Sequence, residues 1–107
     1  DVIGKGISRL LDQIQEYAPK AEVLLISPIY LGKKVWQEEY DQEFSRESVT
    51  VSRNLQPVYE KIARDRQIEF LPAADHVKCC EADQEHLNAE GHKKFAEVVY
   101  RKLQKLL

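Results

Sequence analysis

The stretch "EVLLISP", residues 22–28, is a short apolar run that Pro28 closes. Such an unbroken run is typical of a strand that is buried on both faces, as the strands of parallel sheets are. A second stretch of the same kind, "QIEFLPA", occupies residues 67–73 and also ends near a proline. We therefore predict two parallel strands, near residues 22–27 and residues 68–72.

Three segments with a helical spacing of apolar residues flank these strands. The first ends at Pro19, whose ring cannot continue a helix. The second is expected to begin near residues 48–52, where a hydroxyl can cap the free amides, with Pro57 near its first turn or at a kink. The third is expected to run from Asn88 to the end of the chain. The apolar residues of the three segments are Ile3, Ile7, Leu10, Leu11, Ile14 and Tyr17; Leu55, Val58, Tyr59, Ile62 and Ala63; and Phe95, Ala96, Val99, Leu103 and Leu106.

The resulting order, α-β-α-β-α, indicates an α/β fold, as part of a three-layer, flavodoxin-like α/β/α sandwich with a parallel sheet. Two strands are too few for a stable open sheet, because sheets usually contain about four to six. The remaining strands are expected to come from another part of the same protein, from another chain, or from a second copy in a homo-oligomer. The chain opens on Asp1 within a helical pattern and without a methionine, which fits a processed terminus or part of a longer polypeptide.

The bulk composition is that of a globular chain. Of the 107 residues, 43% are hydrophobic and 32% are charged, and the formal net charge is −2. This balance gives no strong attraction to nucleic acid or to an anionic membrane, so neither is expected as a partner. Cys79 and Cys80 are adjacent, and a bridge between neighbours would strain disulfide geometry. Reduced thiols, and with them a cytoplasmic location, are therefore expected.

Two residues with catalytic potential follow the second predicted strand. Asp83 and His86 lie three positions apart in a loop at the carboxyl end of that strand, where open α/β sheets build their sites. At this spacing the carboxylate can accept the Nδ1 proton of the imidazole, which leaves Nε2 free to take a proton from a hydroxyl. The alternative is an ordinary polar loop before a helix that Asn88 caps.

The longer string "ADQEHLNAEGHKKFAEVVYRKL", residues 82–103, resembles the carboxyl-terminal motif of the SGNH (GDSL-type) hydrolases. These are esterases and lipases with a three-layer α/β/α fold, and their Asp-x-x-His-Leu segment precedes the final helix. The upstream order of helices and strands also agrees, so the resemblance covers residues 1–107 as the C-terminal half of one such domain. It implies that His86 is the general base, that Asp83 orients it, and that the substrate is a small carboxylic ester.

The chain departs from the family pattern in what it lacks. The nucleophile of the family lies in a Gly-Asp-Ser segment, and an oxyanion donor lies in a Gly-x-Asn-Asp segment; neither motif occurs in this sequence. The resemblance therefore implies that the N-terminal half of the same protein, or another chain, supplies both. We expect this chain alone to be inactive.

The segment from Ile29 to Glu47 joins the first predicted strand to the second helix and is rich in aromatic residues. Long connections of this kind are often lids or binding loops. Because it leaves the same sheet edge as the Asp83–His86 loop, we expect it to cover the substrate cleft. Tyr30 and Trp36 are the candidate substrate-binding residues, as an apolar wall for an acyl or aryl group. The alternative is a purely structural loop with one short helix.

Two other classes of function are alternatives to ester hydrolysis. The first is a metal-binding domain, but the spacing of the candidate ligands matches no usual zinc pattern, so no metal and no cofactor are expected. These candidates are His76, Cys79, Cys80, Asp83, His86 and His92. The second is a non-catalytic α/β interaction module that completes its sheet with a partner. That reading gives no reason for the placement of Asp83 and His86.

Overall fold

The computed structural model describes residues 2–107 of the chain. Its elements are, in order, helix α1 (Val2–Tyr17), strand β1 (Leu24–Ser27), helix α2 (Arg46–Arg66), strand β2 (Glu69–Pro72), the short 3₁₀ helix η1 (Ala73–Asp75) and helix α3 (Ala89–Leu106). The predicted α-β-α-β-α order is confirmed. Only the single turn of η1 was not expected.

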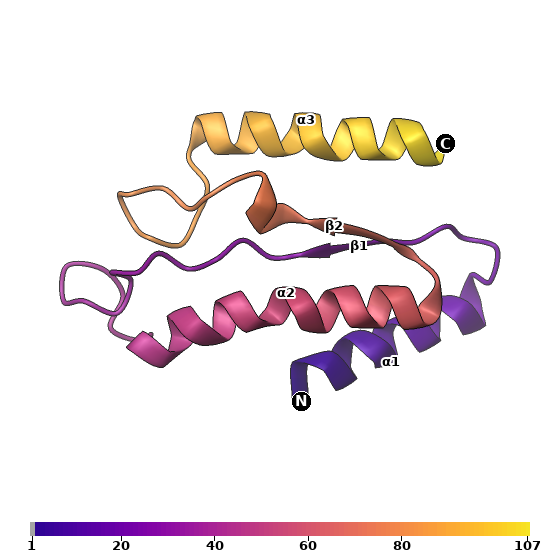
Figure 1. The fold of residues 1–107 in the computed structure, drawn as a ribbon, viewed down its shortest axis with the longest axis horizontal. Coiled ribbons are helices and arrows are strands. Elements are labelled where there is room, and N and C mark those ends of the chain that lie inside the picture. The colour runs from indigo at the N-terminus through magenta and orange to yellow at the C-terminus, as the bar shows by residue number, and fades with distance from the viewer. Residues whose placement is uncertain (1) are drawn as a thin grey trace.

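The two strands pair in parallel, with Leu24 opposite Glu69 and Ser27 opposite Pro72. The predicted strand positions and their parallel pairing are therefore confirmed. Figure 1 shows α3 on one side of the strands and α2 with α1 on the other, so the elements form three layers. The chain leaves both strands toward the same end of the molecule, and the two longest loops lie there (Figure 1).

Helix α2 begins earlier than the sequence analysis predicted. Ser45 caps it, because its hydroxyl accepts from the amide of Ser48 at 3.4 Å while the Ser48 hydroxyl accepts from the amide of Ser45 at 3.0 Å. This reciprocal cap satisfies amides that the helix itself cannot pair. Pro57 consequently lies in the helix interior, not in the first turn, and removes the amide that would donate to the carbonyl of Arg53.

The ends of the other two helices agree with the predictions. Helix α1 stops at Tyr17, two residues before Pro19. Helix α3 starts directly after Asn88, whose side-chain oxygen accepts from the amide of Gly91 at 2.8 Å. The loop between η1 and α3 is therefore closed at its far end by a fixed helix cap.

The chain is more open than a self-contained domain of its size. It exposes 7874 Å² of surface, whereas a folded monomer of 12.4 kDa exposes about 6,100 Å². Its radius of gyration is 15.4 Å, against about 13 Å for a compact domain of this length. No residue of α3 is buried, and α1 buries only Gly4 and Leu11. Much of the predicted core face of both helices is thus exposed, including Leu10, Tyr17, Ala96 and Leu103. Within residues 2–107, no helix has the length and apolar character needed to cross a membrane.

Candidate active site

The loop from η1 to α3 folds back on itself and is held by its own backbone. The amide of Cys80 donates to the carbonyl of His86 at 2.7 Å, and the amide of Gln84 donates to the carbonyl of Cys80 at 3.0 Å. These two bonds close residues 80–86 into a compact turn at the carboxyl end of the sheet. Both predicted catalytic residues lie inside this turn.

Asp83 and His86 form the hydrogen bond that their spacing predicted. The distance from Asp83 Oδ2 to His86 Nδ1 is 2.7 Å. The other carboxylate oxygen, Oδ1, accepts from the amides of Glu85 at 2.8 Å and His86 at 3.0 Å, and from the thiol of Cys80 at 3.2 Å. Because one oxygen is fixed by the turn, the second is held against the imidazole. His86 Nε2 has no partner within residues 2–107.

The electrostatics of the pair follow from these bonds. The amides of His86 and Glu85, and then the imidazole, hold the pKa of the Asp83 carboxyl well below its ordinary value. The hydrogen bond and negative charge of Asp83 raise the pKa of His86 above 6.5. The His86 side chain is 76% exposed, so this carboxylate, and not burial, sets its titration. At low pH the imidazolium is stabilised, and at higher pH neutral His86 can act as a base.

Titration of His86 gives a direct test of the pair. We expect NMR to find a pKa above 6.5 for His86, and Asp83→Asn to lower it toward that ordinary value. The matched control is Asp65→Asn, which removes a carboxylate paired with Lys61 on α2 and should leave the titration of His86 unchanged. An unshifted His86 pKa in the Asp83→Asn variant would contradict the pairing.

The same shifts predict how folding stability depends on pH. The folded pKa of His86 is raised, so its contribution is complete below about 6.5 and is lost as the pH rises through the folded pKa. The folded pKa of Asp83 is lowered, so its contribution is present above the ordinary value of 3.8 and is lost as the pH falls through the folded pKa.

Gln84 joins the Asp83–His86 turn to the loop that follows β1. Its side-chain Oε1 accepts from the amide of Lys34 at 3.2 Å, and its backbone carbonyl accepts from the amide of Gly32 at 2.8 Å. The residue is only 5% exposed and has a left-handed backbone with φ of 64°. Gln84 was not predicted from the sequence, because neither its burial nor its partners across the fold leave a local signal.

Gly32 is the position where this contact tolerates no side chain. A Cβ at Gly32 would overlap the Gln84 side-chain amide and lie 2.8 Å from Gln84 Cβ. We expect Gly32→Ala to lower the free energy of unfolding by about 1–3 kcal/mol, as overpacking does. Urea denaturation of the two proteins measures this difference. Gly6→Ala is the control, because nothing lies within 4 Å of that position in α1 and alanine favours a helix. Equal stability of Gly32→Ala and the parent protein would contradict this packing.

The two candidate substrate-binding residues lie in different surroundings. Tyr30 lines a cavity of about 540 Å³, which Glu81 and Gln84 of the Asp83–His86 turn also line. Trp36 contacts Arg46 of α2, whose guanidinium carbon lies 4.4 Å from the ring centroid, and its indole donates to the carbonyl of Lys33 at 2.9 Å. The structure thus places Tyr30 in a cavity that the Asp83–His86 turn borders, and it places Trp36 against the start of α2. The loop between β1 and α2 contains turns but no helix.

Two of the predicted alternative metal ligands, Cys80 and His86, both bond to the Asp83 carboxylate. Cys79 and Cys80 are free thiols, and Cys80 donates to Asp83. In the part of the chain that the structure describes, no group of three or more histidine, cysteine, aspartate or glutamate side chains could hold a metal ion. Burial raises the pKa of Cys79, which disfavours the thiolate that a metal would need.

Several solved structures share this arrangement. One matches with a TM-score of 0.89 and 25% sequence identity, over 98% of this chain and 50% of its own. Est24, a carbohydrate acetylesterase from Sinorhizobium meliloti, matches with a TM-score of 0.82 and 23% identity, over 98% of this chain and 51% of its own. A carbohydrate acetylesterase family member from the same organism matches with a TM-score of 0.78 and 22% identity, over 97% and 51%. No protein-family model and no curated protein matches the sequence.

These matches cover nearly all of this chain but only half of each solved chain, so the chain spans about half the length of the structures it resembles. The two-stranded sheet and the exposed faces of α1 and α3 agree with that proportion. The chain therefore has the α/β/α fold of the SGNH-type esterases that its sequence resembles, and it spans half of that fold.

Proposed function

We propose that residues 1–107 are the C-terminal half of a carboxylic ester hydrolase of the SGNH type. One observation carries this proposal, namely the 2.7 Å hydrogen bond between Asp83 and His86 at the carboxyl end of the sheet. The esterases among the solved structures of the same fold support it. The partner is the N-terminal half of the same protein or another chain, and the expected location is the cytoplasm.

The geometry of the pair suits acyl transfer through a serine supplied from outside this chain. His86 Nε2 removes the serine proton as the oxygen attacks the ester carbonyl, and Asp83 stabilises the imidazolium that forms. The imidazolium then gives that proton to the departing alcohol, which leaves an acyl-serine. In the deacylation step, His86 takes a proton from water as the water oxygen attacks the acyl carbon. The imidazolium then returns that proton to the serine oxygen as the acyl–serine bond breaks and the acid is released.

The substrate is proposed to be a small carboxylic ester, with the loop between β1 and α2 beside the cleft. Gln84 supports this placement, because its bonds to Gly32 and Lys34 hold the start of the loop against the Asp83–His86 turn. Tyr30 would then supply an apolar wall near the turn. Trp36 would act further along the loop, where Arg46 fixes its ring.

A non-catalytic interaction module is the second candidate, and the exposed apolar faces of α1 and α3 favour it. Val2, Leu10, Tyr17 and Tyr100 are all more than half exposed, as residues of an interface are before assembly. The rest of a hydrolase domain would cover the same faces. The module, however, gives no role to a carboxylate whose second oxygen is held against an imidazole.

Hydrolysis of short 4-nitrophenyl esters by the full-length protein tests the proposal. Release of nitrophenol is expected to exceed the buffer rate by many orders of magnitude, as for other enzymes. A full-length protein that released it no faster than buffer would refute ester hydrolysis and favour the interaction module.

A further inference from the structure

The cavity that Tyr30 lines is strongly cationic. It lies between the loop after β1, helix α2 and the segment that leads into the Asp83–His86 turn. Lys33, Lys34, Arg53 and Lys78 line it, and Glu81 is the one carboxylate among its lining residues. The lining of the cavity is therefore positively charged, whereas the chain as a whole has a formal net charge of −2.

The charges of this cavity are not neutralised within the described chain. None of its four cations forms an ion pair within residues 2–107. The Glu81 carboxylate accepts from the Gln84 side-chain amide at 3.4 Å. Like charges that line one concave surface raise the local potential and attract a counter-ion. A bound anion would therefore be favoured here.

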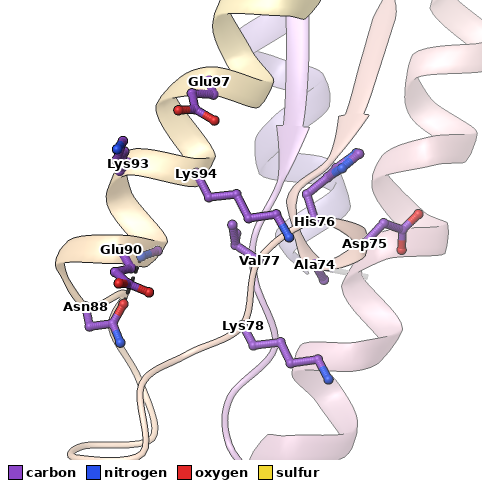
Figure 2. A pocket seen from close by; sticks show the side chains of 11 residues that line it. Ala74, Asp75, His76, Val77, Lys78, Asn88, Glu90, Lys93, Lys94 and Glu97 are labelled. Atoms are coloured by element: carbon purple, nitrogen blue, oxygen red, sulfur yellow. Dashed lines mark hydrogen bonds between the residues drawn. The ribbon is translucent and has the colours of Figure 1, made fainter.

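A neighbouring cavity shows that such an excess is not general to this surface. Figure 2 shows that second cavity, of about 680 Å³, between α3 and the segment after β2. Its lining residues include three lysines and three carboxylates, so its charges balance. They are Lys78, Lys93, Lys94, Asp75, Glu90 and Glu97. Lys78 borders both cavities, and in Figure 2 its side chain extends away from α3.

Arg53 is held in a defined position at the wall of the cationic cavity. Its guanidinium carbon lies 4.8 Å from the centroid of the Tyr30 ring, and the Tyr30 hydroxyl donates to Gln56 Oε1 at 3.3 Å. A stacked guanidinium keeps its planar fork of donors free, and this fork matches the two oxygens of a carboxylate or phosphate. The cavity thus combines one guanidinium fork with the ammonium groups of three lysines.

We propose that this cationic cavity binds an oxyanion, a carboxylate or phosphate group, and that it selects ester substrates that carry one. Glu81 and Gln84 belong both to the lining of the cavity and to the turn that holds Asp83 and His86, so an anion bound in the cavity would lie beside that turn. The anion site is inferred from the charge of the cavity lining, and it does not depend on catalysis. Its link to substrate choice rests on the proposed ester hydrolysis.

Binding is tested first, without reference to catalysis. The full-length protein is titrated with succinate, with inorganic phosphate and with neutral succinamide by calorimetry at constant ionic strength. We expect saturable binding of an oxyanion and none of succinamide, with the tighter of the two oxyanions identifying the group. Arg53→Gln and, independently, Lys78→Gln should weaken that binding about tenfold, because each removes a charge-assisted hydrogen bond. Lys93→Gln, which borders only the balanced cavity, is the control and should bind as the parent protein does.

Substrate choice is tested with a matched pair of esters, 4-acetoxybenzoate and 4-acetoxybenzamide. In the parent protein, we expect kcat/KM to be higher for the anionic ester than for the neutral one. Arg53→Gln should reduce this ratio about tenfold by raising KM for the anionic ester. Lys93→Gln should leave the ratio unchanged. Failure of both oxyanions to bind, or binding that Arg53→Gln and Lys78→Gln leave intact, would overturn the anion site even in an active esterase. Saturable oxyanion binding by a protein that cleaves neither of these esters nor 4-nitrophenyl esters would support the site and refute ester hydrolysis instead.

Discussion

Replacing His86 by alanine is expected to lower kcat for ester hydrolysis by the full-length protein at least about a thousandfold. The reason is that a serine hydroxyl is a poor nucleophile until a neighbouring base removes its proton. His86 is held for that role by Asp83 at 2.7 Å, and its Nε2 has no partner within residues 2–107. Steady-state kinetics with a 4-nitrophenyl ester measure the loss.

Asp83→Asn should reduce kcat as well, but by about tenfold less than His86→Ala does. Asparagine keeps a side-chain oxygen that can accept from the amides of Glu85 and His86, so the turn is preserved. It loses the negative charge that stabilises the imidazolium and fixes the tautomer. The base itself remains, although it is less well oriented.

His92→Ala is the matched control for these two variants. His92 is an exposed histidine in the first turn of α3, and it should be replaceable with less than a twofold change in kcat. A fully active His86→Ala variant would exclude His86 as the base. Equal losses in His86→Ala and Asp83→Asn would instead mean that the pair acts as one unit and that neither residue alone can be assigned the role.

The parts of this fold that the sequence predicted are those with a local physical cause. Leu24, Leu25 and Ile26 form an unbroken apolar run, so their strand could be placed to within two residues. The parallel pairing followed from the helix that separates the two strands. The hydrogen bond between Asp83 and His86 also follows from spacing alone, since three residues in a turn bring the side chains together.

The parts that the sequence did not predict depend on partners far along the chain or on competing signals. Helix α2 starts at Arg46 because Ser45 and Ser48 cap each other, a pairing that a sequence with several nearby serines does not single out. Gln84 bonds to Lys34, fifty positions away, and its left-handed backbone has no glycine to mark it. Burial of the apolar faces was expected from periodicity, but a helix face is covered only when another element packs on it.

Combining this chain with the other half of the fold is expected to produce the largest change of all. We expect the 107-residue chain alone to hydrolyse esters no faster than buffer, and addition of the separately produced N-terminal half to raise the rate by on the order of 10⁵ or more. Within residues 2–107, no serine is placed against His86. Ser27 is fully buried. The Ser52 hydroxyl donates to the carbonyl of Val49 and accepts from the amide of Leu31. Without a nucleophile, the His86 imidazole alone should accelerate ester hydrolysis little.

The physical reason for assembly lies in the surface that the chain leaves open. Its exposed area exceeds that of a compact 12.4 kDa monomer by roughly 1,700 Å². A standard specific interface buries about 800 Å² on each partner, so the open surface is about twice as large and suits a permanent interface. Hydrogen exchange in α1 and α3 should therefore slow on addition of the second half, together with the gain in activity. The His86→Ala chain is the control: it should show the same protection and yet restore less than about a thousandth of the activity. Activity in the isolated chain would contradict the need for a nucleophile from the other half. Equal activity restored by the His86→Ala chain would show that the catalytic base lies elsewhere.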